Sequence, residues 1–184
     1  MTEATGVDSA DIFVRLAKAE DGPAIGEAHA AAWRLGFGHL LGVEFLERAA
    51  AGRRNGWQYA ITHVLAQSNL VLVAGRDTRV LAFSQSGQSD DGAAGLEIFA
   101  FYCHPVAWGT GVADALMQET CAVLSTRARR ALLWTPNEAH RARRFYERCG
   151  FRRTGRTRNE PLGDWQPTPT YEEVAAVEYA RSLG

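Results

Sequence analysis

Residues 96–124 constrain the fold of this chain more than any other stretch. They begin with the apolar and aromatic run LEIFAFYC, whose composition is typical of a buried β-strand. His104-Pro105 follows, and Pro105 ends the strand because it has no N–H to donate to a neighbouring strand. Gly109 and Gly111 then precede a tract whose apolar residues recur at helical spacing. The stretch therefore predicts a strand, a glycine turn and an amphipathic helix.

A turn of this kind can bind phosphate. Backbone N–H groups converge at a helix N-terminus, and Gly109 and Gly111 leave no bulky side chain in the way. Two well-known phosphate motifs do not fit, because a dinucleotide fingerprint needs a small residue where Asp114 stands and a Walker loop needs Gly-Lys-Ser/Thr. A turn whose glycines only permit close packing is the alternative interpretation.

A second motif, RFYERCGF at residues 144–151, follows about twenty residues after this helix. Together the two motifs resemble the GNAT-type acyl-CoA-dependent N-acetyltransferases, in which the turn reads Q/R-x-x-G-x-G/A and the later segment reads F-Y-E-x-x-G-F. The resemblance extends from about residue 12 to residue 183. Two positions depart from it: Trp108 stands where the family has Gln or Arg, and Ala139 stands where many members have Asn.

The resemblance implies an α/β (α+β) fold with a single GNAT domain. Its sheet would be mixed and mostly antiparallel, with about six to seven strands, splayed at the centre and flanked by helices on both faces. At 184 residues the chain is long enough for one domain and short for two, so residues 12–184 are expected to form it. Residues 1–11 have no basic start and no apolar centre, and we predict a disordered tail rather than a secretory signal.

Hydrophobic periodicity predicts the remaining elements. Strands are expected at residues 12–16, 69–74, 79–86 and 131–134, from residue 151, and at 171–183, where the pattern is also compatible with a helix. Helices are expected after Pro23, over 43–50 and 57–66, and between a cap at Asn137 and a C-terminal Gly150. Residues 157–170, which contain three of the six prolines, are predicted to form a long loop.

Composition describes an ordinary globular protein, with 46% hydrophobic and 22% charged residues and a net charge of -1. No apolar run approaches the roughly 20 residues of a membrane span. Cys103, Cys121 and Cys149 are odd in number and form no metal-type pair, so we expect reduced thiols and a cytoplasmic protein without membrane contact. The five histidines are scattered, and no metal site is predicted.

Residues 127–158 are strongly basic, with eleven arginines against Glu138 and Glu147. A basic patch can bind nucleic acid, but the aromatic residues here are better explained by packing than by an exposed base-stacking surface. We therefore predict no nucleic-acid partner. Most of the arginines are interpreted as a solvated helix face, and a few could attract the phosphates of a coenzyme.

The resemblance also implies where acetyl-CoA, the expected co-substrate, would bind. In the family the pantetheine arm lies between the central strand and the next one, so Phe101, Tyr102 and Cys103 would flank it. The turn would hold the pyrophosphate through six residues: Trp108, Gly109, Thr110, Gly111, Val112 and Ala113. No metal is implied.

The implied reaction moves an acetyl group from the thioester directly to a primary amine. It needs a neutral amine, a donor for the oxyanion and a proton for the departing thiolate. Tyr146 matches the family's tyrosine near the sulfur and is the expected proton donor; the alternative is a core tyrosine. Glu97 is the candidate base, because it is the acidic residue in an apolar strand and burial would raise its pKa, although it could lie at the solvated start of the strand. His104 is a second candidate, ahead of His29 and His39.

By the same resemblance, residues 33–41, the 157–170 loop and Trp134 would wall the acceptor pocket. Its aromatic residues would be Trp33, Phe37, Trp134 and Trp165, and four carboxylates could attract a cationic amine: Asp90, Asp91, Glu160 and Asp164. The acceptor stays open between a small-molecule amine, an amino acid, an antibiotic and a peptide N-terminus. The alternative function is a catalytically weak acyl-CoA-binding sensor or interaction module, and the chain could form a homodimer.

Overall fold

The computed structural model describes residues 12–67, 69–89 and 95–184, and the predicted tail lies outside them. In this part of the chain seven strands form one sheet: β1 (Ile12–Leu16), β2 (Leu70–Arg76), β3 (Arg79–Gln88), β4 (Leu96–Cys103), β5 (Arg130–Pro136), β6 (Arg152–Gly163) and β7 (Tyr171–Ser182). The α-helices are α1 (Gly22–Phe37), α2 (Val43–Ala66), α3 (Val112–Ser125) and α4 (His140–Arg148). Short 3₁₀ helices occupy Ala19–Asp21 and Pro105–Ala107.

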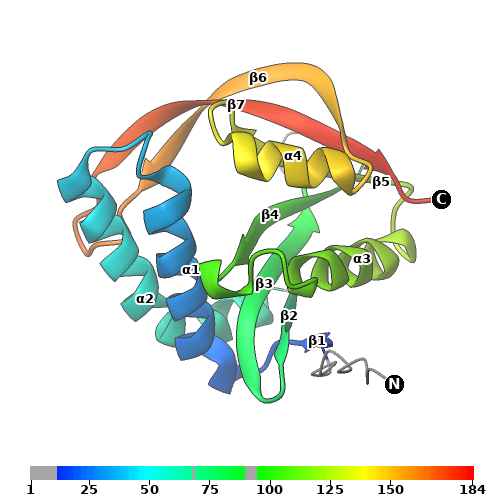
Figure 1. Cartoon of the computed structure of the whole chain (residues 1–184), viewed down its shortest axis with the longest axis horizontal. Coiled ribbons are helices and arrows are strands. Elements are labelled where there is room, and N and C mark those ends of the chain that lie inside the picture. The colour runs from blue at the N-terminus through cyan, green and yellow to red at the C-terminus, as the bar shows by residue number, and fades with distance from the viewer. Residues whose placement is uncertain (1–11, 68, 90–94) are drawn as a thin grey trace, which may run out of the picture.

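The sheet is mixed and mostly antiparallel, as predicted. Its strand order is β1-β2-β3-β4-β5-β7-β6, and among the strand pairs of the described residues β4 with β5 is the parallel one. Helices α1 and α2 cover one face, and α3 and α4 cover the other (Figure 1). A parallel pair requires a crossover connection, which α3 provides between β4 and β5.

On each face of the sheet, the apolar side of the helices packs against the strands and buries them. On the first face, Ile25 of α1 and Trp57 and Ile61 of α2 are almost fully buried against β2 and β3. On the second face, Val112 and Leu116 of α3 pack on β2, β3 and the end of β4. The predicted amphipathic helix after the glycine turn is confirmed.

Strand β4 is where the sheet opens. It pairs with β3 along its whole length, with Phe99 inserted as an extra residue between Ile98 and Ala100. On its other edge it pairs with β5 only from Leu96 to Ile98, although β5 continues to Pro136. Beyond Ile98 the two strands separate, which confirms the predicted splay at the centre of the sheet. A bulge of this kind locally bends and twists a strand.

The prediction of two helical pieces at 43–50 and 57–66 was wrong, because α2 is continuous. Gly52 and Gly56 lie between the two expected pieces, and their small size serves packing. A Cβ at Gly52 would lie 2.2 Å from the Asp164 carbonyl oxygen, and one at Gly56 would lie 3.1 Å from the Trp165 ring. The glycines let the β6–β7 connection approach the helix.

The long loop predicted at 157–170 was also wrong over its first half, because β6 runs to Gly163 and leaves only residues 164–170 as the connection. Pro161 is tolerated because β6 is an edge strand, where a missing N–H breaks no ladder on the outer side. Asn137 does not cap α4; its side-chain amide donates to Glu138 instead (2.7 Å), and the helix begins at His140.

Two glycines of α1 should respond oppositely to alanine. A Cβ at Gly26 would lie 2.5 Å from the Arg54 carbonyl oxygen of α2, so Gly26→Ala must push the two helices apart and should lower the unfolding free energy by about 1–3 kcal/mol. A Cβ at Gly36 meets nothing within 4 Å, so Gly36→Ala should raise it by about 0.5–1 kcal/mol through helix propensity. Urea unfolding of both variants measures the difference, and equal shifts would contradict the close packing of α1 on α2.

Candidate active site

The separation of β4 and β5 leaves a cleft of about 620 Å³. It runs through the sheet, because its lining includes Phe37 and Tyr102 on the side of α1 and Phe101, Ala113 and Tyr146 on the side of α3 and α4. The predicted site residues that line it are Phe37, Phe101, Tyr102, Cys103, Trp108, Gly109, Gly111, Ala113, Trp134 and Tyr146. The motifs that are far apart in the sequence therefore meet at one opening.

The glycine turn lies at one end of the cleft. Gly109 and Gly111 both have left-handed backbones, with φ of 75° and 88°, which side-chain-bearing residues rarely adopt. A Cβ on Gly109 would meet no atom within 4 Å, so the space in front of it is open. Gly111 precedes α3 and offers no capping side chain, and the first N–H groups of a helix have no partner within the helix. Unbonded N–H groups are thus presented where an anion could bind.

Contacts from other elements hold this turn in shape. The Arg76 guanidinium at the end of β2 donates to the Thr110 carbonyl (2.8 Å), and the Thr110 hydroxyl donates to the Ala107 carbonyl (2.8 Å). The Val112 side chain is fully buried in the core. Thr110 and Val112 therefore shape the turn from behind, and their side chains do not line the cleft as the other predicted turn residues do.

Trp108 is fixed at the end of the cleft where the glycine turn lies. Its indole Nε1 donates to the Cys103 carbonyl at 2.9 Å, which anchors the ring to the last residue of β4. The Arg141 guanidinium of α4 lies over the same ring, with Cζ 3.8 Å from the ring centroid. The residue that departs from the family pattern therefore contacts both walls of the cleft.

Tyr146 reaches the cleft from α4. Its side chain is buried among the rings of Phe101, Phe151 and Tyr179, and within the described residues no hydrogen bond from its hydroxyl to another side chain or carbonyl is found. Burial raises the pKa of Tyr146, and the nearby Tyr102 phenol raises it further. The hydroxyl is thus protonated at neutral pH and faces the cleft.

Tyr102 was expected beside Phe101 and Cys103, but neighbouring residues of a strand point to opposite faces. Its ring packs against His29 of α1, with centroids 4.1 Å apart. Phe101 and Cys103 instead face α3 and α4. Tyr102 thus lines the opposite half of the cleft from the other two.

Glu97 is not brought into the cleft. It lies in the part of β4 that is still paired on both edges, opposite Gly87 of β3 and Leu132 of β5. Its carboxylate is buried and accepts a hydrogen bond from the Ser89 hydroxyl at 2.9 Å. Since it is absent from the residues around the opening, the structure gives no support to Glu97 as the base. His39, from the α1–α2 connection, does line the cleft.

Two of the four aromatic residues expected in the acceptor pocket, Phe37 and Trp134, line the cleft. The other two do not, because they lie behind its wall. Trp33 is 1% exposed and stacks on the buried Arg53 guanidinium, 3.2 Å from ring centroid to Cζ. Trp165 covers the rings of His29 and Trp57 from outside.

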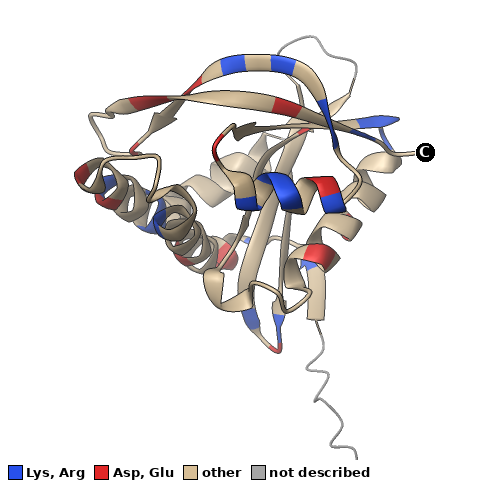
Figure 2. Ribbon diagram, turned by 45° about the horizontal axis from the view of Figure 1, so that its top comes forward, with Lys and Arg blue, Asp and Glu red and all other residues tan. Residues whose placement is uncertain are grey.

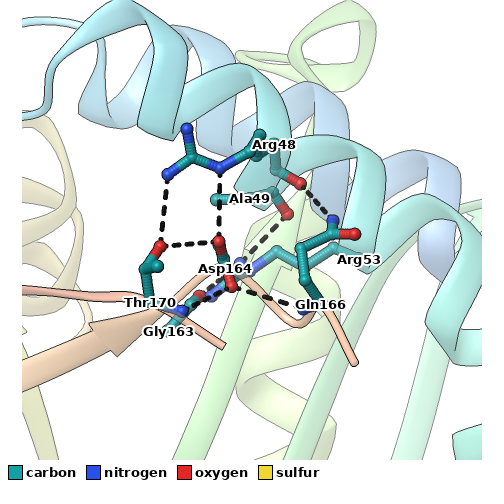
Figure 3. Close-up of polar contacts among 7 residues, drawn as sticks. All are labelled: Arg48, Ala49, Arg53, Gly163, Asp164, Gln166 and Thr170. Carbon is teal, nitrogen blue, oxygen red and sulfur yellow. Dashed lines mark hydrogen bonds and ion pairs between the residues drawn. The ribbon is translucent and has the colours of Figure 1, made fainter. Parts of the chain in front are cut away.

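The β6–β7 connection that carries Trp165 is fastened to α2 (Figure 3). The buried Asp164 carboxylate accepts from the Thr170 hydroxyl at 2.7 Å and from Arg48 at 3.4 Å. Arg53 donates to the Gly163 carbonyl at 3.0 Å, and the Gln166 side chain donates to the Arg48 carbonyl at 3.0 Å. Asp164 therefore anchors this connection, and with Glu160 held by Arg158 it does not offer a free carboxylate to a cationic amine.

The basic segment divides between structural contacts and the cleft. Blue positions mark α4 and β6 in Figure 2. Arg156 binds Glu178 (2.7 Å), and Arg143 binds the Tyr179 hydroxyl (3.1 Å). Arg141, Arg144 and Arg148 of α4 line the cleft, as positions one helical turn apart should when they share a face. The cleft therefore has a positive wall near the glycine turn.

The cysteine thiols are another kind of potentially reactive group near the cleft. Cys103, Cys121 and Cys149 are free thiols, and burial raises the pKa of Cys103, the cysteine in the cleft lining, to about 11. A thiol of this kind is a poor nucleophile because the thiolate is the reactive form. Across residues 12–67, 69–89 and 95–184, no three His, Cys, Asp or Glu side chains are grouped to hold a metal ion. The helices of this same part of the chain include none with the length and apolarity to cross a bilayer.

Comparison with known proteins agrees with this geometry. The family model described as the acetyltransferase (GNAT) domain matches residues 67–153, which include β4, the glycine turn, α3, β5 and α4. Over these residues the chain is similar to GNAT acetyltransferase domains. No curated protein sequence matches the chain.

Solved structures extend the GNAT fold over nearly the whole chain. PaiA N-acetyltransferase from Thermoplasma acidophilum, crystallised with coenzyme A, has a TM-score of 0.72 at 15% identity, covering 94% of this chain and 99% of that one. The putative acetyltransferase YncA from Salmonella typhimurium, with acetyl-CoA, gives 0.64 at 17% identity, covering 94% of each chain. The ribosomal-protein-S18-alanine N-acetyltransferase from Escherichia coli gives 0.63 at 16% identity, covering 95% of each. At these identities the likeness shows the GNAT fold.

Sequence reasoning missed three residues that shape the site. Arg76 and Arg53 act across the fold, on the Thr110 and Gly163 carbonyls, and no local pattern marks such contacts. Arg141 was interpreted as part of a solvated helix face. Its spacing of three residues from Arg144 and seven from Arg148 was the available signal that it shares the cleft face.

Proposed function

We propose that this protein is an acetyl-CoA-dependent N-acetyltransferase that moves the acetyl group directly to a primary amine. One observation carries the proposal: the cleft at the splay joins the glycine turn, where no side chain caps the first N–H groups of α3, to the buried Tyr146 hydroxyl. These are a diphosphate site and a proton donor on one continuous path. The GNAT domain match over the same elements supports it.

The coenzyme would bind along the open edge of β4. Past Ile98 this edge has no β5 partner, so its N–H and C=O groups are free to pair with the amides of a pantetheine arm. Phe101 and Cys103 would flank the arm on one side. The diphosphate would lie on the turn at Gly109 and Gly111, facing the positive wall of α4.

The chemistry follows from what the cleft offers. The amine attacks the thioester carbonyl, and an N–H of β4 donates a hydrogen bond to the oxyanion that forms. The thiolate then leaves and takes a proton from Tyr146. Because burial raises the pKa of Tyr146, the phenol carries its proton at neutral pH and has it to donate. Cys103 would take no covalent part, since its thiol stays protonated.

For the base we favour His39 over Glu97. His39 lies in the cleft lining, and its Nε2 is 3.0 Å from the Glu138 carbonyl oxygen. A carbonyl only accepts hydrogen bonds, so Nε2 carries the proton and Nδ1 is left free to accept one from an incoming ammonium, directly or through water. Histidine is the commonest general base in enzymes.

The acceptor would enter on the α1 side, past Phe37, Trp134 and Tyr102. This half of the cleft is aromatic, and the nearby Glu160 and Asp164 are already paired with arginines. Proteins of similar fold bear names that refer to an alanine of a ribosomal protein and to phosphinothricin, so fold alone does not choose the acceptor. A small-molecule amine or a peptide N-terminus remains the proposal, and the three free thiols fit a reducing cytoplasm.

Thiol release from acetyl-CoA in the presence of a panel of amines tests the function. The panel should contain polyamines, amino acids, aminoglycosides and peptides with a free N-terminus, each assayed from pH 6 to 9. We expect at least one amine to accelerate thiol release with formation of its N-acetyl product, and His39→Gln to lower the rate of that reaction. Binding of acetyl-CoA without turnover of any amine would favour a coenzyme-binding sensor instead.

A further inference from the structure

Trp108 stands where the family pattern has Gln or Arg, so the turn lacks that polar side chain. The structure places another polar group, the Arg141 guanidinium, beside it. The indole cannot accept or donate toward the turn, because its Nε1–H is already bonded to the Cys103 carbonyl (2.9 Å). One ring face is covered by the Arg141 guanidinium at 3.8 Å. An indole face attracts a guanidinium through cation–π and stacking interactions. Trp108 therefore holds a cation at the edge of the turn.

Arg141 differs from Arg143 and Arg148 of α4 in what it contacts. Arg143 donates to the Tyr179 hydroxyl and the Asn137 carbonyl, and Arg148 pairs with Asp114. Arg141 makes neither a hydrogen bond nor an ion pair with any other residue that the structure describes, and its contact there is with the Trp108 ring. Stacking leaves the N–H donors of the guanidinium unused, so they are available to a ligand.

The position of Arg141 matches an anion on the turn. Arg141, from α4, lines the same cleft as Trp108, Gly109 and Gly111. The turn presents backbone N–H groups but no cationic side chain of its own. A diphosphate bound there would carry two negative charges facing α4, and a guanidinium binds such oxygens through paired, charge-assisted hydrogen bonds.

We propose that Arg141 binds the diphosphate of the coenzyme and that Trp108 is the residue that positions it, so that α4 supplies the side-chain contact that the turn lacks. The inference rests on the proposed coenzyme site and adds a binding residue to it. It also explains why a large apolar ring is compatible with a phosphate-binding turn, because the ring stacks on the guanidinium and does not contact the phosphate.

Calorimetry with three ligands tests the assignment: acetyl-CoA, its dephospho form without the 3′-phosphate, and acetyl-pantetheine without any nucleotide. Arg141→Gln should weaken acetyl-CoA and the dephospho form by about 10- to 100-fold each and leave acetyl-pantetheine unchanged. Arg141→Lys should recover only part of the loss, because an ammonium does not match the bidentate fork. Arg153→Gln on β6 removes the same charge outside the cleft lining and should bind as the wild type does.

The role of Trp108 is tested by the double variant. If Trp108 acts through Arg141, Trp108→Leu should weaken acetyl-CoA binding in the wild-type background by about 3- to 10-fold and add little in Arg141→Gln. Additive effects would overturn the positioning role. Wild-type affinity of Arg141→Gln, or a loss seen with acetyl-CoA but not with the dephospho form, would overturn the diphosphate assignment while the coenzyme site stands. Failure of the wild-type protein to bind acetyl-CoA would overturn both.

Discussion

Replacing Tyr146 by phenylalanine should lower the rate constant of acetyl transfer by about 100- to 1,000-fold, because the thiolate would then leave without a positioned proton donor. The affinity for acetyl-CoA should change little, since the ring that packs against Phe101 and Phe151 is kept. Folding stability should also be kept, because no hydrogen bond between the hydroxyl and another described residue is lost. Steady-state kinetics with an accepted amine, combined with calorimetry, separates the two quantities.

Tyr179→Phe is the matched control. Tyr179 belongs to the same buried aromatic cluster, 6.3 Å from Tyr146 between ring centroids, but its hydroxyl bonds to Glu147 (2.7 Å) and Arg143 (3.1 Å) away from the cleft. This variant should lose about 1–2 kcal/mol of unfolding free energy and keep its turnover. If Tyr146→Phe behaved like Tyr179→Phe, the phenol of Tyr146 would be a packing residue and the proton would come from elsewhere.

Gly109→Glu should weaken acetyl-CoA binding by about 100-fold or more, because it places a carboxylate where the diphosphate is expected and like charges in contact cost several kcal/mol. The space in front of Gly109 is open, so the new side chain meets no atom of the protein near its Cβ. A non-glycine residue at φ of 75° should lower the unfolding free energy by about 1–2 kcal/mol, because a side chain is disfavoured in this left-handed conformation. Calorimetry of the variant against the wild type measures the loss.

Gly155→Glu is the matched control for Gly109→Glu, because it introduces the same backbone strain and the same negative charge away from the cleft. Gly155, on β6, has φ of 91°, and a Cβ there also meets nothing within 4 Å, but it does not line the cleft. Both variants should therefore melt at similar temperatures, and only Gly109→Glu should lose the coenzyme. Equal affinities of the two would place the diphosphate away from the turn.

The parts of the fold that could be predicted from the sequence are those that neighbouring residues determine. Leu96–Cys103 was bounded correctly because its apolar run ends at a proline, and α3 began at Val112 as the glycines indicated. The splay between β4 and β5 was predicted through the family resemblance and is found. The extra residue at Phe99, by contrast, has no signal in LEIFAFYC, since a bulge depends on how the partner strand pairs.

The predicted site residues that lie away from the cleft do so for one physical reason, which is that long-range pairing decides which way a side chain points. Glu97 was chosen because it is acidic in an apolar strand, but its register opposite Leu132 keeps it in the closed part of the sheet. Trp33 and Trp165 are aromatic residues near the acceptor region that pack around Arg53 instead of facing the opening. The two helical pieces expected at 43–50 and 57–66 are one helix, in which Gly52 and Gly56 accommodate the segment at Asp164 and Trp165.

The most direct test of the coenzyme site is an amide NMR titration of the wild-type protein with acetyl-CoA. If the account is correct, the largest shifts will fall on the backbone N–H groups of the turn at Gly109 and Gly111 and of the first turn of α3, with a second set along the open edge of β4 after Ile98. Shifts confined to the basic edge strand β6, or no shifts at all, would contradict the claim that this cleft holds the coenzyme.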